Sequence, residues 1–208
     1  KVIDTGFGEY IFVEETKYKV LTGVARLTKD GQSVSGDTFS MINLPSGELL
    51  MALSDGMGSG TSAFDDSKNV IELLEQMSEA GFSQTSAIRL INSLYMSDQE
   101  FENYATLDIS LINLYKGECS FLKNGAVGTY VLNQGKMYCI EGQSLPMGVV
   151  SDAEPYIGKM SLYPGDYVIM MTDGVADMFS QERYNLEKFI KQIEIVNPGD
   201  MAQAIVDE

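Results

Sequence analysis

Histidine and tryptophan are both absent from the 208 residues, and cysteine occurs only twice. Without histidine, the chain cannot contain a Ser-His-Asp triad, a Cys-His pair or a histidine-ligated zinc site. Any catalysis must therefore use carboxylates, hydroxyls, backbone groups or a metal ion. Cys119 and Cys139 each lie in a strand-like apolar segment. That pattern favours reduced thiols in a core over a secreted disulfide framework.

Basic residues are also scarce, because 14 Lys and Arg stand against 30 Asp and Glu, for a formal net charge of -16. A field of this sign repels nucleic acids and anionic membrane surfaces, so we expect no nucleic-acid partner. No apolar run is long enough to cross a bilayer. We therefore expect a cytoplasmic location, including the cytoplasmic side of a membrane-anchored parent protein.

The size and composition predict one globular domain over residues 1–208. The first residue is Lys1 rather than Met, and the last residues resemble an unfinished helix, so we expect both ends to be cut from a longer protein.

The order of hydrophobic patterns predicts an α+β fold. Period-2 alternation predicts strands at residues 10–13, 18–25, 37–43, 48–53, 105–114, 119–123, 128–132, 136–140, 156–162 and 167–171. Helical spacing predicts consecutive helices at residues 62–80 and 85–97, and helical segments at 175–179, 186–195 and from 198 onward. The four strands between 105 and 140 are predicted to form one antiparallel meander. Two antiparallel sheets flanked by helix pairs are the simplest assembly.

The stretch from Leu49 to Thr61 carries the most information, because a predicted strand ends in Asp55 and glycines then lead into a helix. One interpretation is a dinucleotide-binding loop, but the third glycine falls at position 60 instead of 61 and no βαβ unit follows. The other is a metal site in which Asp55 supplies a carboxylate and the backbone at Gly56 folds tightly enough to add a carbonyl. The metal interpretation explains why the aspartate comes first.

Two further aspartates have similar surroundings. Asp173 follows the apolar run at 168–171 and precedes a glycine, while Asp37 follows a glycine and precedes the hairpin that leads into Asp55. A single Asp-Gly is usually a turn, so only the set of three carries weight. If the two sheets pack face to face, the three carboxylates can converge on one cluster.

These motifs resemble the SpoIIE-type bacterial branch of the PPM, or protein phosphatase 2C-like, serine/threonine phosphatases. The resemblance covers nearly the whole chain and rests on segments 23–26, 35–37, 54–60, 105–108, 123–126, 145–148 and 171–174, in the family's order. The Asp-Gly-Met-Gly run at 55–58 is the most specific of them.

The resemblance implies a PPM-type β-sandwich between helix pairs and a two-metal Mn²⁺ or Mg²⁺ centre. Its ligands would be Asp37, Asp55 and Asp173, together with the carbonyl of Gly56. Such a centre activates a water for direct attack on a phosphorylated side chain. The family pattern also includes a final strand with an Asp-Asp-x-Thr element, which has no counterpart before Glu208. We therefore expect a domain truncated at its C-terminus, with the last strand missing and the second metal site weak or empty.

Four other residues are weaker candidates. Arg26 matches an Ala-Arg position of the family and is either a substrate-phosphate ligand or a strand-end arginine paired to a surface carboxylate. Asp108 shares a strand face with Thr106 and Ser110, where it either belongs to a solvated or core network or supports the metal site. Members of the family are commonly switched through the two helices after the glycine loop. Met57 and Leu73 are therefore candidates for regulatory coupling.

The predicted function is a metal-dependent phosphatase acting on phosphoserine of a small regulatory protein. The resemblance implies a phosphorylated anti-sigma-factor antagonist as substrate, a setting in sporulation or stress response, and an upstream regulatory domain in the parent chain. The alternatives are a phosphatase of another bacterial phosphoprotein and a non-catalytic phosphatase-fold module that senses or binds a partner. Homo-oligomer formation and the choice between Mn²⁺ and Mg²⁺ stay open.

Overall fold

A computed structural model describes residues 2–4, 6–12, 14–26, 35–58, 60–97, 104–180, 186–192 and 197–207. The strands form a five-stranded sheet, a three-stranded sheet and a separate N-terminal hairpin, and every strand pair is antiparallel. The large sheet has the order β3 (Asp37–Asn43), β4 (Glu48–Asp55), β5 (Leu107–Asn113), β6 (Glu118–Asn124) and β9 (Tyr156–Ser161). The small sheet has the order β10 (Tyr167–Ile169), β7 (Thr129–Asn133) and β8 (Lys136–Ile140). The hairpin pairs β1 (Val2–Asp4) with β2 (Tyr10–Phe12).

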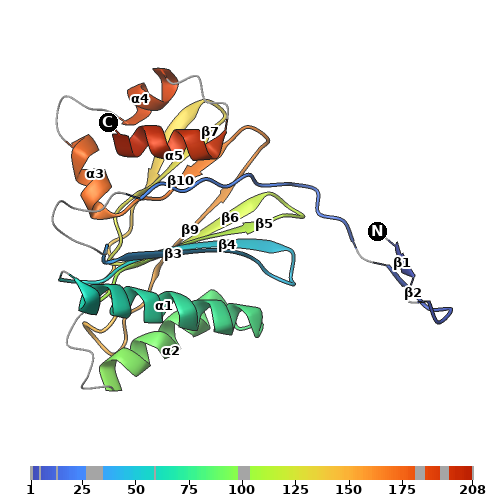
Figure 1. The fold of residues 1–208 in the computed structure, drawn as a ribbon, viewed down its shortest axis with the longest axis horizontal. Helices are drawn as coiled ribbons and strands as arrows, with labels where there is room; N and C mark the ends of the chain where they lie inside the picture. The colour runs from blue at the N-terminus through green and yellow to red at the C-terminus, as the bar shows by residue number, and fades with distance from the viewer. Residues whose placement is uncertain are drawn as a thin grey trace.

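Helices cover the outer face of each sheet (Figure 1). The large sheet is covered by α1 (Thr61–Glu79) and α2 (Gln84–Ser97). On the small sheet lie α3 (Asp173–Ser180), α4 (Leu186–Gln192) and α5 (Pro198–Asp207). The predicted α+β sandwich of two antiparallel sheets between helical layers is confirmed. No helix in the described ranges has both the length and the apolar character needed to cross a bilayer.

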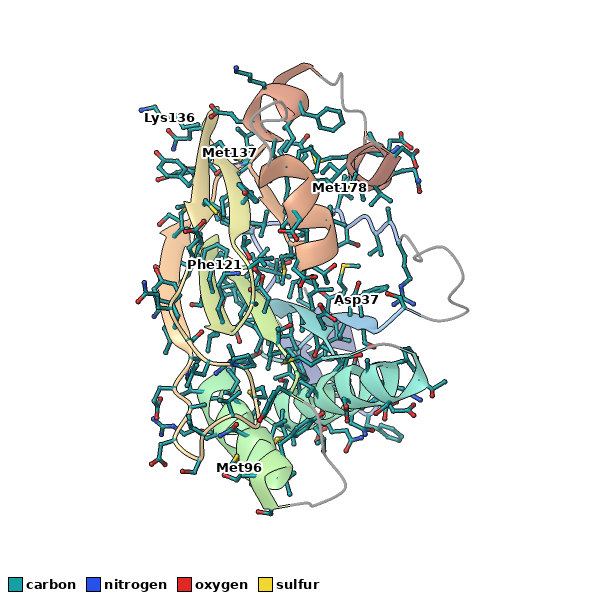
Figure 2. The ribbon with its side chains drawn as sticks, turned by 90° about the vertical axis from the view of Figure 1, so that its left-hand side faces the viewer. Asp37, Met96, Phe121, Lys136, Met137 and Met178 are labelled. Carbon is teal, nitrogen blue, oxygen red and sulfur yellow. The ribbon has the colours of Figure 1, made fainter. Side chains whose placement is uncertain are left out.

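Apolar side chains fill three layers. The first lies between α1, α2 and the large sheet, where residues such as Leu50, Leu74 and Ile109 are fully buried. The second joins the two sheets around Phe121, which Figure 2 shows in the middle of the sandwich. The third lies between the small sheet and its helices.

The prediction that the four strands between 105 and 140 form one meander is wrong, because they belong to two sheets. β5 pairs with β6 in the large sheet, whereas β7 pairs with β8 in the small one, so the chain changes sheet between Asn124 and Thr129. A buried polar network stands at this crossing. Lys123 Nζ donates to Asp108 Oδ2 at 2.7 Å and to Thr129 Oγ1 at 2.8 Å, and the Thr129 hydroxyl donates to the same carboxylate oxygen at 2.7 Å. Asp108 therefore belongs to a core network that joins the two sheets.

The strands on either side of the turn at 163–166 also separate. β9 pairs with β6 in the large sheet and β10 with β7 in the small one. The carboxylate of Asp166 accepts bonds from the backbone N–H of Tyr163 at 2.8 Å and of Gln134 at 2.8 Å. This carboxylate ties the crossing turn to the β7–β8 turn, so the connection spans the sandwich instead of closing a hairpin.

The predicted strand at 18–25 is absent from the structure. The segment is extended and has no ladder, although Tyr18 N–H donates to Leu114 O at 2.9 Å. A Cβ at Gly23 would overlap the backbone of Pro198, so the segment passes tightly against the start of α5. The alternation of apolar residues was not sufficient to predict a strand here, because a strand also requires a neighbouring strand with free backbone groups.

Most other predicted elements are present. The turn at 45–47 connects β3 to β4 as an antiparallel pair, as predicted, and α1 and α2 begin and end within a residue of the predicted bounds. Both cysteines are free, as predicted, but only Cys119 is buried, while Cys139 is exposed. Ser59, Val13 and the predicted helical residues 193–195 lie outside the described residues.

Candidate metal centre

The backbone brings the three predicted aspartates together. Asp37 begins β3 and Asp55 ends β4, and the two are direct partners in the antiparallel register. Asp173 is the first residue of α3, four residues after β10 ends in the other sheet. Thr172 Oγ1 donates to Asp37 Oδ2 at 3.2 Å, which joins the two sheets at this point. The cluster therefore stands where one end of the large sheet meets the connection from the small sheet to its helices.

The electrostatics of the cluster are those of crowded carboxylates. The pKa of Asp55 is raised from 3.8 to about 7, first by burial and then by the charges of Asp37 and Asp173. Such a cluster without a cation carries mutual repulsion, and a divalent cation would relieve it. The raised pKa of Asp55 shows that the three side chains interact, which makes them a candidate cation site.

The donor types fit a hard divalent cation. Carboxylates and carbonyls are the oxygen ligands that Mg²⁺ and Mn²⁺ prefer. A Cβ at Gly36 would lie 3.5 Å from the Gly56 carbonyl oxygen and 3.8 Å from Asp55 Oδ1, so both oxygens lie beside this glycine. A Cβ at Gly56 would overlap the Ala63 carbonyl, so glycine is required there. Among the described residues, no three acidic, Cys or His side chains already form a closed metal cage.

Arg26 lies beside the cluster without pairing to its carboxylates. Its Nη2 donates to the backbone carbonyl of Asp37 at 3.2 Å, and its guanidinium lies 5.6 Å from the centre of the Phe39 ring. The side chain is exposed. It is thus held at the rim of the cluster.

The two candidates for regulatory coupling differ in their surroundings. Leu73 of α1 packs against the apolar core between the helices and the large sheet. Met57, in contrast, has an exposed side chain in the glycine loop and is not packed under the helix pair. Their regulatory role stays a prediction.

Sequence reasoning missed the backbone support behind Asp55. Thr106 N–H donates to the Asp55 carbonyl at 2.9 Å, Thr106 Oγ1 accepts from Asp55 N–H at 3.0 Å, and Met57 N–H donates to Tyr104 O at 2.8 Å. The motif at 105–108 was the available signal in the sequence. Its contact with residues 55–57 depends on the pairing of β4 with β5, which are about 50 residues apart in the chain.

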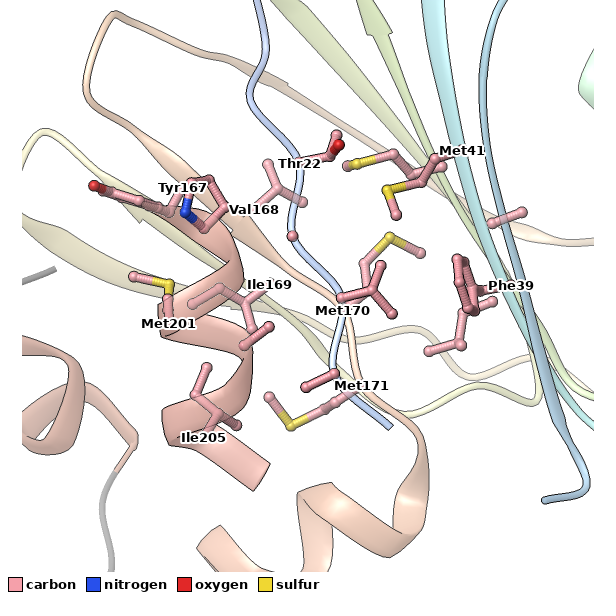
Figure 3. Close-up of a pocket in the computed structure, with 18 of the residues that line it drawn as sticks. Thr22, Phe39, Met41, Tyr167, Val168, Ile169, Met170, Met171, Met201 and Ile205 are labelled. Carbon is pink, nitrogen blue, oxygen red and sulfur yellow. The ribbon is translucent and has the colours of Figure 1, made fainter. Parts of the chain in front are cut away.

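A large cavity between the sheets opens at the same cluster. It has a volume of about 880 Å³, and the extended segment 18–26 runs along it. Figure 3 shows that side chains from β3, β10 and α5 surround it. Seven methionines contribute to its lining: Met41, Met51, Met57, Met170, Met171, Met178 and Met201. Flexible thioethers suit such an irregular space.

Comparisons with known proteins agree with this geometry. The family model of Stage II sporulation protein E (SpoIIE) matches residues 45–208. The chain is 32% identical over 206 residues to Stage II sporulation protein E of Bacillus subtilis (strain 168), covering 98% of this chain and 25% of that protein. The same protein of Priestia megaterium is 34% identical over 194 residues, covering 92% of this chain and 33% of the relative. The chain thus spans a quarter to a third of the length of these curated relatives.

Solved structures extend the match to the fold. The PP2C phosphatase domain of Bacillus subtilis SpoIIE, solved with a fragment of its regulatory domain, has a TM-score of 0.83 and 32% identity, covering 93% of this chain and 58% of that one. RsbX in complex with magnesium has a TM-score of 0.66 at 22% identity, covering 87% of this chain and 81% of that one, and therefore shares the fold. The chain belongs to the SpoIIE family, whose PP2C-type phosphatase fold brings its three aspartates together.

Proposed function

We propose that this chain is a metal-dependent protein serine/threonine phosphatase domain that hydrolyses phosphoserine on a small regulatory protein. The observation that carries the proposal is the convergence of Asp37, Asp55 and Asp173, with the Asp55 pKa raised to about 7 by burial and by its two neighbours. Family membership supports the same activity.

Each residue of the cluster has a distinct part in the proposal. Asp37, Asp55 and Asp173 would hold Mn²⁺ or Mg²⁺ in a two-metal centre, and the Gly56 carbonyl would add a neutral oxygen. When bound, the cations would supply charge neutralisation and an activated water for attack on phosphorus. Arg26, held at the rim through the Asp37 carbonyl, would bind the substrate phosphate. An activated water of this kind needs no imidazole base, so the proposal fits a chain without histidine.

The relatives also support proposals about the substrate, the regulation and the location of this domain. A relative named phosphoserine phosphatase RsbX supports phosphoserine as the target, and the substrate that we propose is a phosphorylated anti-sigma-factor antagonist. An upstream regulatory domain in the parent chain is supported by the relative solved with a fragment of such a domain. We place the domain on the cytoplasmic side, where such a substrate would be found.

The test is hydrolysis of a phosphoserine peptide while Mn²⁺ or Mg²⁺ is titrated. We expect activity to depend on the cation and to fall by at least about 100-fold in Asp55→Asn, because losing a ligand costs more than losing a residue that only supports one. A phosphorylated anti-sigma-factor antagonist should be turned over with a higher kcat/KM than an unrelated phosphoserine peptide.

Two results would count against the proposal. If saturating Mn²⁺ and Mg²⁺ both give no hydrolysis while the cations still bind, the domain is a non-catalytic partner-binding module. If both phosphorylated substrates are turned over equally, the assignment of the anti-sigma-factor antagonist fails, although the phosphatase activity stands.

A further inference from the structure

Asn92 on α2 holds the loop at residues 148–151 of the same chain by three hydrogen bonds. Its side chain is almost fully buried, with 1% exposed. Its Oδ1 accepts from Gly148 N–H at 2.8 Å, and its Nδ2 donates to Val150 O at 2.9 Å and to Ser151 O at 3.0 Å. One amide thus fixes three backbone groups of the segment that follows Met147. The cost of removing it is large, since buried backbone groups left unpaired lose their solvation without compensation.

The held loop is bonded in turn to the strand that supports the candidate metal centre. Met147 and Ala105 form an isolated antiparallel bridge, in which Met147 N–H donates to Ala105 O at 2.9 Å and Ala105 N–H donates to Met147 O at 3.4 Å. Both side chains are fully buried. The loop therefore has a defined position relative to Ala105.

A second isolated bridge joins Ala105 to Gly56. Its bonds run from Met57 N–H to Tyr104 O at 2.8 Å and from Thr106 N–H to Asp55 O at 2.9 Å, on either side of Gly56. The Gly56 carbonyl is the neutral oxygen of the candidate centre. Its direction is set by the peptide planes that these two bonds hold.

We propose that Asn92 is a positioning residue for the metal centre, acting through Met147 and Ala105 on the backbone of Asp55 to Met57. The inference rests on the proposed function in so far as the cluster binds a divalent cation. Asn92 touches neither the cation nor the substrate. It determines where the bridge between residues 105 and 147 lies, and that bridge determines where the Gly56 carbonyl points.

The main test is the affinity of the metal-free protein for Mn²⁺, measured by titration calorimetry. Supporting residues of metal ligands typically contribute 10- to 100-fold in affinity, so we expect Asn92→Ala to bind Mn²⁺ about 10-fold more weakly. The matched control is Tyr95→Phe. It removes one buried hydrogen bond of the same helix, from Tyr95 Oη to Asp66 O at 2.6 Å, and leaves the bonds of Asn92 in place. We expect its Mn²⁺ affinity to stay within about 2-fold of the wild type.

Amide hydrogen exchange of the metal-free protein supplies a readout that needs no cation. In Asn92→Ala, the amides of Met147, Ala105 and Met57 should exchange faster, whereas in Tyr95→Phe they should exchange as in the wild type. A general loosening of α2 would instead accelerate exchange in both variants. Failure of the wild type to bind Mn²⁺ would contradict the proposed function, and the exchange result would still decide whether Asn92 supports this backbone.

A second variant keeps the test valid if Asn92→Ala does not fold. Gly148 has a φ of +86°, and an added Cβ would be 3.5 Å from its nearest neighbours, the rings of Tyr104 and Tyr95, so Gly148→Ala strains the backbone of the same loop without a clash. We expect it to weaken Mn²⁺ binding as well. A folded Asn92→Ala or Gly148→Ala with wild-type Mn²⁺ affinity and wild-type exchange at residues 57, 105 and 147 would overturn the proposal.

Discussion

The two halves of the sandwich are packed differently. In the half formed by α1, α2 and the large sheet, side chains such as Leu74, Ile88 and Ile109 are fully buried. In the core layer between the small sheet and α3 to α5, the buried apolar residues among those described each keep between 3% and 9% of their surface exposed, and the methionine-lined cavity lies beside them. Asp37 and Asp55 belong to the first half, and Asp173 to the second. The candidate centre therefore joins a well-packed frame to a loosely packed one.

The largest difference should appear when the two cores are truncated. We expect Leu74→Ala to lower the free energy of unfolding by about 3–5 kcal/mol, because its closely packed site cannot collapse around the deletion. Ile205→Ala, on the small-sheet side, should cost about 2 kcal/mol, since neighbouring methionines can shift into the space. Urea unfolding monitored by circular dichroism measures both. Equal losses would contradict the difference in packing.

Enlarging a helical alanine tests the same contrast in the opposite direction. Ala87→Leu introduces volume at a position in α2 with no free space and should cost about 1–3 kcal/mol. Ala202→Leu in α5 introduces the same volume at a position that lines the cavity, and it should change stability by less than about 1 kcal/mol. Thermal unfolding of the two variants gives the comparison, and an equally destabilised Ala202→Leu would show that the cavity is closed to side chains.

Acidity tests the place where the halves meet. Because the folded-state pKa of Asp55 is raised to about 7, its protonated form stabilises the metal-free protein at low pH, and this contribution is lost as the pH rises through about 7. Asp55 is only partly buried, so after allowance for solvent screening we expect a loss of about 1–2 kcal/mol.

The measurement for this prediction is the unfolding temperature of chelator-treated protein at pH 4.5 and pH 7.5. Asp55→Asn should show a smaller fall over that interval than the wild type, since carboxylates outside the cluster contribute equally to both. Mn²⁺ at pH 7.5 should restore stability to the wild type. Identical pH dependence in wild type and variant would mean that the three carboxylates do not interact.

The smallest effect is expected at the surface of the well-packed half. Arg89 on α2 makes a bidentate ion pair with Glu154, at 3.0 Å for each hydrogen bond, but both side chains are exposed. Arg89→Ala should therefore cost less than about 1 kcal/mol, and less again at high salt. Chemical unfolding at two salt concentrations checks this. A larger loss would mean that the rigidity of this half depends on its surface charges and not on apolar packing.

Several features could be predicted from local sequence alone. The hairpin between β3 and β4 follows from two alternating runs around Pro45 and Gly47, and it already sets Asp37 opposite Asp55. The helix pair follows from apolar spacing, with Gly81 at a φ of +86° where α1 ends. The burial of Cys139 and the strand at 18–25 were predicted wrongly. Alternation indicates an extended segment, but it does not show which face is buried or whether an edge pairs with another strand.

By itself, the sequence determined most of the helices and strands, the absence of histidine chemistry and the three aspartates beside glycines, because these depend on residue type and on spacing within a few residues. The tertiary structure decided how the strands divide between two sheets, with Asp108, Lys123 and Thr129 buried where the chain crosses. It also decided that Asp173 meets Asp37 and Asp55, and that Asn92 stands behind Gly56 through two backbone bridges. Those contacts join residues far apart in the chain, so they depend on sheet pairing and packing, which no local pattern contains.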